Sequence, residues 1–271
     1  MGILNVTPDS FSDGGNFYSL ETALAQGRQM ILEGADLLDV GGESTRPGAE
    51  SISAQQEMDR VLPVIEGLRR ESDIPLSIDT TKASVASEAV AAGANFINDV
   101  SGLKFDPLMV QTAADSGAGL FLMHTSGRPE VMQQQTVYSD LLGEVCSFLQ
   151  QAAEAAIAAG VDRHAIAIDP GIGFGKDARG NLQLLQKLDL LVSTGYPVLL
   201  GTSRKSFIGH ILQQSDPSER LAGTLASVAL GVVRGAQILR VHDVRSAREA
   251  ALVAWAVREG ELPAAKAETH Q

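Results

Sequence analysis

The sequence predicts an α/β fold, a single (β/α)8 TIM barrel that extends over residues 1–271. Three observations support this prediction: eight short apolar runs recur along the chain, helical patterns separate them, and the length of 271 residues suits one barrel. Runs that are both short and apolar are typical of parallel strands buried on both faces. A doubly wound open sheet is the alternative, although it normally has fewer strands. The eight runs are residues 2–6, 36–40, 75–78, 95–97, 119–123, 165–168, 197–200 and 237–241.

The segments between the runs have helix signals. Ser53 followed by Gln56 predicts a capping box at the start of one helix, because each residue can bond the backbone of the other. An apolar stripe at helical spacing precedes Gly160, which predicts a helix that ends at this glycine. Ser246 with Glu249 predicts a similar capped start for the last helix. Helices that alternate with buried strands indicate the barrel.

Charge and composition exclude several classes of partner. The formal net charge is −12, which argues against binding to nucleic acid or to an anionic membrane surface. The longest apolar stretch, residues 225–233, is too short to span a bilayer. The only cysteine, Cys146, cannot form an internal disulfide, which favours a reducing compartment, and we expect the protein in the cytoplasm. The polar tail from about residue 264 is expected to fray.

Each run is followed by polar or ionisable residues. In a (β/α)8 barrel the carboxyl ends of all strands meet at one rim, and active sites lie there. Chance placement would scatter such groups to both ends of the barrel, so their convergence indicates an enzyme. In strand order the groups are Asn5, Glu43 with Arg46, Asp79, Asn98, His124, Asp169, Ser203 with Arg204 and Lys205, and Arg240 with His242.

The acceptors among these groups indicate the ring of a substrate. Asp79, Asn98 and Asp169 offer two carboxylates and one amide. A carboxylate in a pocket that excludes water favours a pair of donors, such as an amino group beside a ring N–H. Guanine-like and pterin-like heterocycles present such an edge.

The cations indicate a phosphate-bearing ligand. Lys205, Arg240 and His242 supply positive charge or hydrogen-bond donors. Asn5 offers a hard, uncharged oxygen, which suits a Mg²⁺ ion that keeps most of its waters and is shared with a diphosphate.

Each of these residues also has an ordinary structural interpretation. Asp79 and Asp169 could cap helices, His242 could be a satisfied structural histidine, and Arg204 could be a solvated surface charge. No two histidines have the H-x-x-x-H spacing, and no G-x-S-x-G motif occurs, which argues against a zinc site and against a serine hydrolase. It is much less probable that the groups at all eight strand ends have separate structural roles than that they form one site.

Eight segments match the motifs of one family, in its order and over essentially the whole chain. Residues 2–15, GILNVTPDSFSDGG, and residues 39–48, DVGGESTRPG, are the two long and specific matches. The chain therefore resembles the dihydropteroate synthases. The other matching segments are residues 77–80, 97–99, 122–124, 169–176, 203–206 and 240–243.

The resemblance implies roles for the matching residues. Asn5 would bind Mg²⁺ and would hold the diphosphate together with Arg240 and His242, and Thr45 would contact the substrate. The pterin pocket would be lined by Asp79, Asn98, Asp169 and Lys205, with Met123 and Phe174 packed nearby. The p-aminobenzoate subsite would be formed by Phe11, Arg46, Pro47 and Ser203.

The implied reaction is the transfer of a pterin CH₂ group to the arylamine of p-aminobenzoate, with release of diphosphate and formation of 7,8-dihydropteroate. The arylamine is already neutral near pH 7, so the difficult step is the departure of diphosphate. Mg²⁺, Arg240 and His242 would stabilise its charge, and the ring anchored by Asp169 would stabilise cationic character at carbon, in a dissociative step. Lys205, Asp169, Arg240 and His242 would be the catalytic set.

The resemblance also implies properties of the whole protein. Because residues 43–48 keep the ESTRPG pattern and Ser12 follows Phe11 directly, we expect sensitivity to sulfonamides. A homodimer is expected from the family, and residues 225–233 could contribute to its interface. The chain begins directly at the first run, whereas family members have a preceding segment that covers the barrel floor, so that segment is expected to be missing.

Two other functions remain as alternatives. A methyltetrahydrofolate corrinoid methyltransferase would share the pocket of Asp79, Asn98 and Asp169 but would not need the cations after the last two runs. A non-catalytic pterin-binding protein would bind the pterin diphosphate without turnover.

Overall fold

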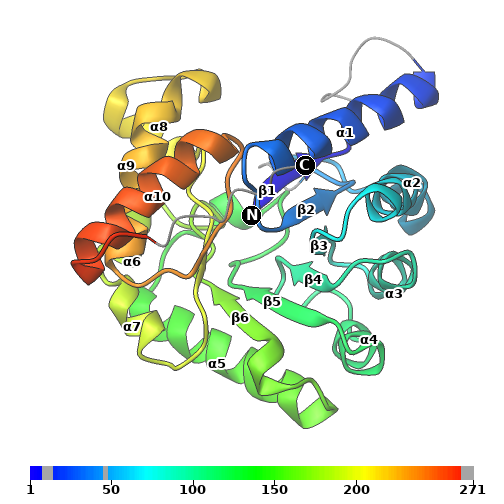
Figure 1. Ribbon diagram of the computed structural model, residues 1–271. Coiled ribbons are helices and arrows are strands. Elements are labelled where there is room, and N and C mark those ends of the chain that lie inside the picture. The colour runs from blue at the N-terminus through cyan, green and yellow to red at the C-terminus, as the bar shows by residue number, and fades with distance from the viewer. Residues whose placement is uncertain (8–14, 45–47, 264–271) are drawn as a thin grey trace.

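The computed structural model describes residues 1–7, 15–44 and 48–263, without the side chains of residues 15–19. The strands lie around the centre of the molecule and the helices lie outside them (Figure 1). Four predicted substrate-binding residues, Phe11, Thr45, Arg46 and Pro47, fall outside the described residues, as does the predicted frayed tail from residue 264.

Six of the strands form one parallel sheet in chain order, and the last two form a parallel pair. The register aligns Asn5 with Gly41, Gly41 with Asp79, and Asp79 with Asn98, so these residues lie at one level. The strands are β1 Gly2–Asn5, β2 Leu38–Gly41, β3 Leu76–Asp79, β4 Phe96–Asp99, β5 Gly119–Met123, β6 Ile166–Asp169, β7 Leu199–Leu200 and β8 Ile238–Leu239.

Backbone bridges join the sheet and the pair into a closed barrel. Ile168 bridges Val198 on one side, and Gly2 bridges Val241 on the other, where the Ile3 amide donates to the Val241 carbonyl over 2.9 Å. An open doubly wound sheet would have two unpaired edge strands, so that alternative is wrong and the TIM barrel is confirmed.

The strands match the predicted runs with a small offset. Several end one or two residues later than predicted, because the ladder continues into polar residues such as Asp79, Asp99 and Asp169, whereas the prediction followed apolar residues alone. The last two strands are shorter than predicted.

Helices surround the barrel, and their ends follow local capping. The Ser53–Gln56 capping box is confirmed, with the Gln56 amide donating to Ser53 Oγ over 3.2 Å, and Gly160 ends its helix as predicted. The predicted cap at Ser246 is wrong: α10 begins at Val244, and the Asp243 carboxylate before it pairs with Arg204 instead. The helices are α1 Gly15–Leu32, α2 Ala54–Glu71, α3 Ala83–Ala91, α4 Met109–Ser116, α5 Leu141–Ala159, α6 Ala178–Gln186, α7 Leu188–Val192, α8 Ser206–Leu212, α9 Leu221–Val233 and α10 Val244–Glu259.

The barrel interior has an apolar layer below a polar one. Alternate strand residues point inward, and the rings of Phe96 and Phe121 stack there with their centroids 5.0 Å apart. The next inward positions toward the carboxyl ends of β4 and β6 are Asn98 and Asp169. The apolar layer therefore closes the barrel from below and confines polar ligands to the upper rim.

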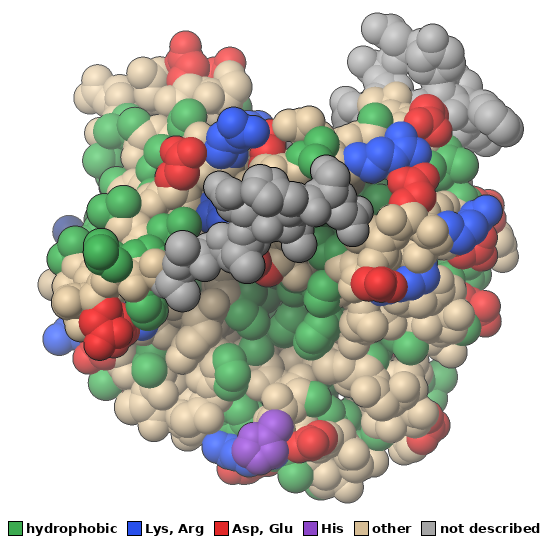
Figure 2. All heavy atoms as spheres, in the orientation of Figure 1, with side chains coloured by type: hydrophobic (Ala, Val, Ile, Leu, Met, Phe, Trp, Pro, Cys, Tyr) green, Lys and Arg blue, Asp and Glu red, His purple; other side chains and the backbone are tan. Residues whose placement is uncertain are grey.

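Charged side chains of both signs lie on the visible face of the molecule (Figure 2). In Figure 2 acidic and basic side chains alternate around the edge of the visible face, with no large basic patch. Among the described residues, no helix has the length and hydropathy needed to cross a membrane.

Candidate active site

Arg240, which follows β8, lies between two carboxylates inside the barrel. Its Nε donates to Asp39 Oδ2 and its Nη2 donates to Asp79 Oδ2, each over 2.6 Å. Asn98 Nδ2 donates to the same oxygen of Asp39 over 3.0 Å. Asp39, which the sequence prediction did not include, thus connects Asn98 with Arg240, and Arg240 in turn bonds Asp79.

Burial governs the charge states in this cluster. Burial raises the pKa of Asp79 to about 7, against the opposing effect of Arg240, and Asp39 raises it further. Burial alone would lower the pKa of Arg240, but the two carboxylates raise it, so the guanidinium stays charged. Asp79 therefore changes protonation near neutral pH.

Asp169, at the end of β6, is held by the backbone of its own loop. Its Oδ1 accepts a hydrogen bond from the Gly171 amide over 2.7 Å. Gly171 has φ +68°, and a Cβ there would lie 1.9 Å from the His124 carbonyl oxygen, so only glycine fits this turn. Burial raises the pKa of Asp169 to about 6, although the Gly171 bond opposes the shift.

Lys205 follows β7 and lies near the charges of Arg240, Asp169 and Asp79. Its Nζ is 4.1 Å from the centroid of the Phe174 ring, a cation–π contact. Burial lowers the pKa of Lys205 to about 8, and the charge of Arg240 lowers it further. Phe174 packs in a small buried cluster with Met123, Met132 and Val100, so the two predicted apolar contacts of the pocket do lie together.

His242 and Ser203 face each other at the ends of the last two strands. Ser203 Oγ lies 2.9 Å from His242 Nδ1, and burial lowers the pKa of His242 to about 4, so the ring is neutral near pH 7. Arg204 is not a free surface charge, because it pairs with Asp243 over 2.7 Å.

The first strand supplies the predicted metal ligand. Asn5 ends β1 beside β2 and is partly exposed. Among the described residues, no cluster of three or more His, Cys, Asp or Glu side chains could hold a metal ion by itself. A single amide oxygen suits a hard ion such as Mg²⁺ only if substrate oxygens and waters complete its shell.

Comparisons with known proteins agree with this geometry. The family model described as "Pterin binding enzyme" matches residues 1–242. A dihydropteroate synthase of Synechocystis sp. is 50% identical over 95% of this chain and 89% of its own length. The chain belongs to the dihydropteroate synthase family. It is a transferase that condenses 6-hydroxymethyl-7,8-dihydropterin diphosphate with p-aminobenzoate in folate biosynthesis. The two alternatives, a corrinoid methyltransferase and a non-catalytic pterin-binding protein, are therefore wrong.

Solved dihydropteroate synthases share the fold closely. The enzyme of Yersinia pestis in complex with a sulfonamide drug superposes with a TM-score of 0.90 at 45% identity, over 96% of this chain and 94% of that one. The enzyme of Xanthomonas albilineans with 4-aminobenzoic acid gives 0.90 at 47% identity, over 95% and 92%.

Lys176 is a buried residue that the sequence prediction overlooked. Its Nζ contacts His124 Nδ1 at 2.8 Å, the His124 carbonyl at 2.9 Å and the Phe174 carbonyl at 3.0 Å. It therefore ties the end of β5 to the loop after β6, next to two residues of the predicted pterin pocket, Met123 and Phe174. Burial lowers its pKa well below the ordinary value, and Asp169 opposes this.

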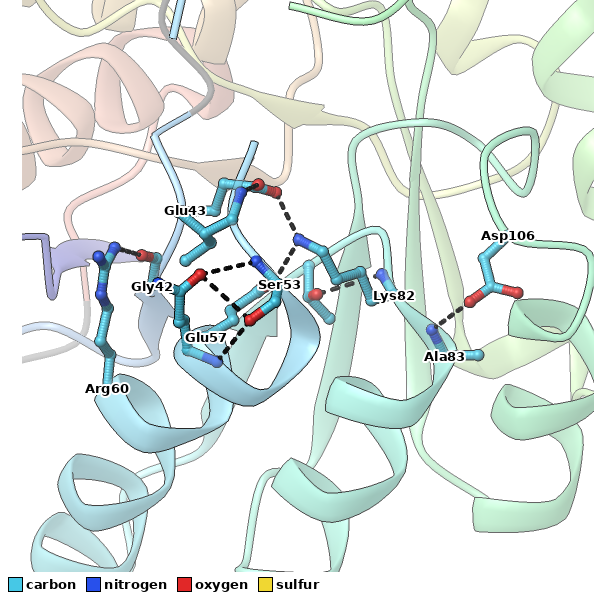
Figure 3. A network of polar contacts seen from close by, with 11 residues as sticks. Gly42, Glu43, Ser53, Glu57, Arg60, Lys82, Ala83 and Asp106 are labelled. Carbon is cyan, nitrogen blue, oxygen red and sulfur yellow. Dashed lines mark hydrogen bonds and ion pairs between the residues drawn. The ribbon is translucent and has the colours of Figure 1, made fainter. Parts of the chain in front are cut away.

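A second overlooked lysine holds the end of β2. Lys82 Nζ donates to Glu43 over 2.8 Å and to Glu57 of α2 over 2.6 Å (Figure 3). The other oxygen of Glu43 accepts from the Ile52 amide over 2.7 Å, so Glu43 joins both sides of the segment that contains residues 45–47. In the sequence, Asp39 was detectable as an acid inside an apolar strand, whereas no local pattern marked Lys82.

Proposed function

We propose that the polar rim of the barrel binds the pterin diphosphate and p-aminobenzoate, and that its residues have the roles the sequence indicates. One observation supports this most: side chains from β3, β4, β6 and the loop after β7 lie at the same end of the barrel, where the strands end above the apolar layer. Donor and acceptor types there suit a pterin ring, and the cations there suit a diphosphate.

The pterin ring would lie among Asp79, Asn98, Asp169 and Lys205. Buried carboxylates that lack an external donor are costly, and an amino group beside a ring N–H would satisfy them. Asp79 Oδ1 is buried and accepts no hydrogen bond from the described residues. Met123 and Phe174 would pack against the ring.

The diphosphate would be held by Arg240, His242 and Asn5. Mg²⁺, when bound at Asn5 and to the diphosphate, would neutralise charge that builds on the leaving group. Arg240 keeps its charge in the barrel and donates to the same anion. His242 is neutral near pH 7 and donates through a ring N–H, while Asp169 holds the pterin as cationic character develops at the CH₂ carbon.

The arylamine would attack from the side of Ser203, with Phe11, Thr45, Arg46 and Pro47 completing the substrate contacts. The amine nitrogen is neutral, so its attack needs no general base before bond formation, and its proton leaves afterwards. Sulfonamides resemble p-aminobenzoate, and the Yersinia pestis relative was solved with such a drug. We expect sulfamethoxazole to compete with p-aminobenzoate.

We further propose a single cytoplasmic domain that forms a homodimer. Eight strands share one barrel, and the one cysteine is a free thiol, which suits a reducing compartment. Helices α9 and α10 expose Leu230, Val233, Val253 and Val257, each by half or more of its surface. Sedimentation equilibrium tests the dimer: a monomer at micromolar concentration would contradict it.

The test of the site follows diphosphate release by purified protein with the pterin diphosphate, p-aminobenzoate and Mg²⁺. We expect release that requires all three and that falls sharply in Asp169→Asn and Lys205→Ala. Asp36→Asn, which removes an exposed carboxylate at the amino end of β2, is the matched control and should keep full activity. Unchanged release in Asp169→Asn and Lys205→Ala would contradict the proposed site.

A further inference from the structure

We propose that Asp39 is a positioning residue, which holds Asn98 and Arg240 in the orientations that bind the pterin diphosphate. This inference rests on the proposed roles of Asn98 and Arg240. Asp39 itself would not touch the substrate.

Asp39 occupies an inward position on β2, one level below the rim. Its side chain has 0% exposure, so no ligand can reach it without rearrangement. One oxygen, Oδ2, accepts both from Arg240 Nε at 2.6 Å and from Asn98 Nδ2 at 3.0 Å. The other, Oδ1, is buried and has no partner among the described residues. A buried carboxylate with this arrangement serves its two donors rather than a ligand.

The contact fixes which way the amide of Asn98 faces. A carboxylate only accepts hydrogen bonds, so Asn98 must turn its NH₂ group toward Asp39. The amide oxygen then points away from Asp39 and can accept from the amino group of a heterocycle. Without Asp39 the amide could flip, and its NH₂ group would face the donors of the pterin.

The contact also divides Arg240 between two carboxylates. Its Nε bonds Asp39 while its Nη2 bonds Asp79 Oδ2 over 2.6 Å, so Asp79 holds only one edge of the guanidinium. Without Asp39, Arg240 could turn to bond Asp79 with two parallel N–H groups, the geometry that guanidinium and carboxylate favour. That pairing would occupy the carboxylate needed for the pterin and would draw Arg240 away from the diphosphate.

Asp39→Asn tests the proposal. The new amide keeps the shape but offers the two donors a neutral oxygen in place of a charged one, and its own NH₂ group takes the position of Oδ1, which has no described partner. We expect the Kd of the pterin diphosphate, measured by calorimetry, and its KM to rise roughly 10- to 100-fold, the usual cost of removing a group that orients a ligand-binding residue. The KM of p-aminobenzoate should change little.

Asp99→Asn is the matched control for a merely structural effect. Asp99 is equally buried on the neighbouring strand but points to the other face of the sheet, where it accepts from the Ser101 and Leu103 amides. We expect Asp99→Asn to lower the melting temperature without weakening pterin binding. Equal loss of pterin affinity in both variants would overturn the proposal.

A double-mutant cycle shows whether Asp39 acts through its two partners. In an Asn98→Ala, Arg240→Ala background, Asp39→Asn should weaken pterin binding by less than about 3-fold, because no oriented group remains. The same loss in both backgrounds would overturn the proposal. If Asn98→Ala and Arg240→Ala themselves leave pterin binding unchanged, the proposed roles of Asn98 and Arg240 are contradicted, whatever the result for Asp39. Should Asp39→Asn not fold, Asp39→Ser, which can admit a water, gives the same comparison.

Discussion

In the described part of the chain, buried cations are paired with acids on one side of the barrel and unpaired on the other. Around β2 and β3 two buried or half-buried cations each bond two acids: Arg240 bonds Asp39 and Asp79, and Lys82 bonds Glu43 and Glu57. Around β5 to β7, Lys176 and Lys205 form no ion pair with any described carboxylate.

The difference indicates which buried cations the protein pairs by itself and which remain for a ligand to pair. A cation that is shared between two acids is already satisfied and holds neighbouring elements together. An unpaired buried cation is costly, and an anionic ligand would relieve that cost. A chain of net charge −12 can therefore still offer Lys205, a cation unpaired among the described residues, inside the proposed substrate pocket.

The largest effect is expected at Asp169. Asp169→Asn removes the charge of the buried carboxylate at the end of β6, while the Gly171 amide can still donate to the new side chain. Loss of charge-assisted bonds to the pterin should lower kcat/KM for the pterin diphosphate by at least about 100-fold, with little change in the melting temperature. Steady-state kinetics and calorimetric melting check this. A variant that melts early and binds normally would show that Asp169 serves stability, as Lys82 does.

Lys82→Met should destabilise the side of the barrel where cations are paired with acids. It leaves Glu57 buried without a cation, and burial already raises the pKa of Glu57 against the effect of Lys82. Lys82 itself is partly exposed, so we expect a loss of about 1–3 kcal/mol in the free energy of unfolding. Adding Glu57→Gln should restore part of it, because the lone charge is gone. Chemical denaturation of both variants measures this, and no recovery would mean that Lys82 contributes mainly through Glu43.

Lys176→Met tests the stability contribution of a buried lysine on the side of the barrel where the described lysines form no ion pairs. The variant leaves the carbonyls of His124 and Phe174 without their donor, which should cost about 1–3 kcal/mol of unfolding free energy. It breaks no ion pair with a described carboxylate, so the net loss should be no larger than for Lys82→Met. Denaturation at the same pH compares the two, and a much greater loss would show that Lys176 is satisfied by its neutral partners alone.

The smallest effect is the pH dependence of pterin binding. Asp169 has a pKa of about 6 and Asp79 about 7, both raised by burial, so their charged forms are lost as the pH falls through this range. Lys205, with a pKa lowered to about 8, loses its charge above that value. Affinity for 6-hydroxymethyl-7,8-dihydropterin, which lacks the titrating diphosphate, should therefore peak between pH 7 and 8 in fluorescence titrations. A flat profile from pH 5 to 9 would show that these charges do not govern ring binding.

The sequence predicted best those features of the fold and site that follow from residues close together in the chain. Alternation of apolar runs and helices predicted the barrel, and the polar residues after each run predicted Asp79, Asn98 and Asp169 as neighbours in space. It could not reveal Asp39 as the link between Asn98 and Arg240, because 201 positions separate Asp39 from Arg240. The Ser246 cap failed for a related reason: the Arg204–Asp243 ion pair at the start of α10 involves a residue from another loop.

A crystal structure with 6-hydroxymethyl-7,8-dihydropterin diphosphate tests the account most directly. We expect the amino group and ring N–H of the pterin to contact Asp169, Asp79 and the amide oxygen of Asn98, with the diphosphate beside His242 and Arg240. Asp39 should remain bonded to Asn98 and Arg240, out of contact with the ligand. A pterin bound away from these carboxylates, or one bonded to Asp39 itself, would contradict the account.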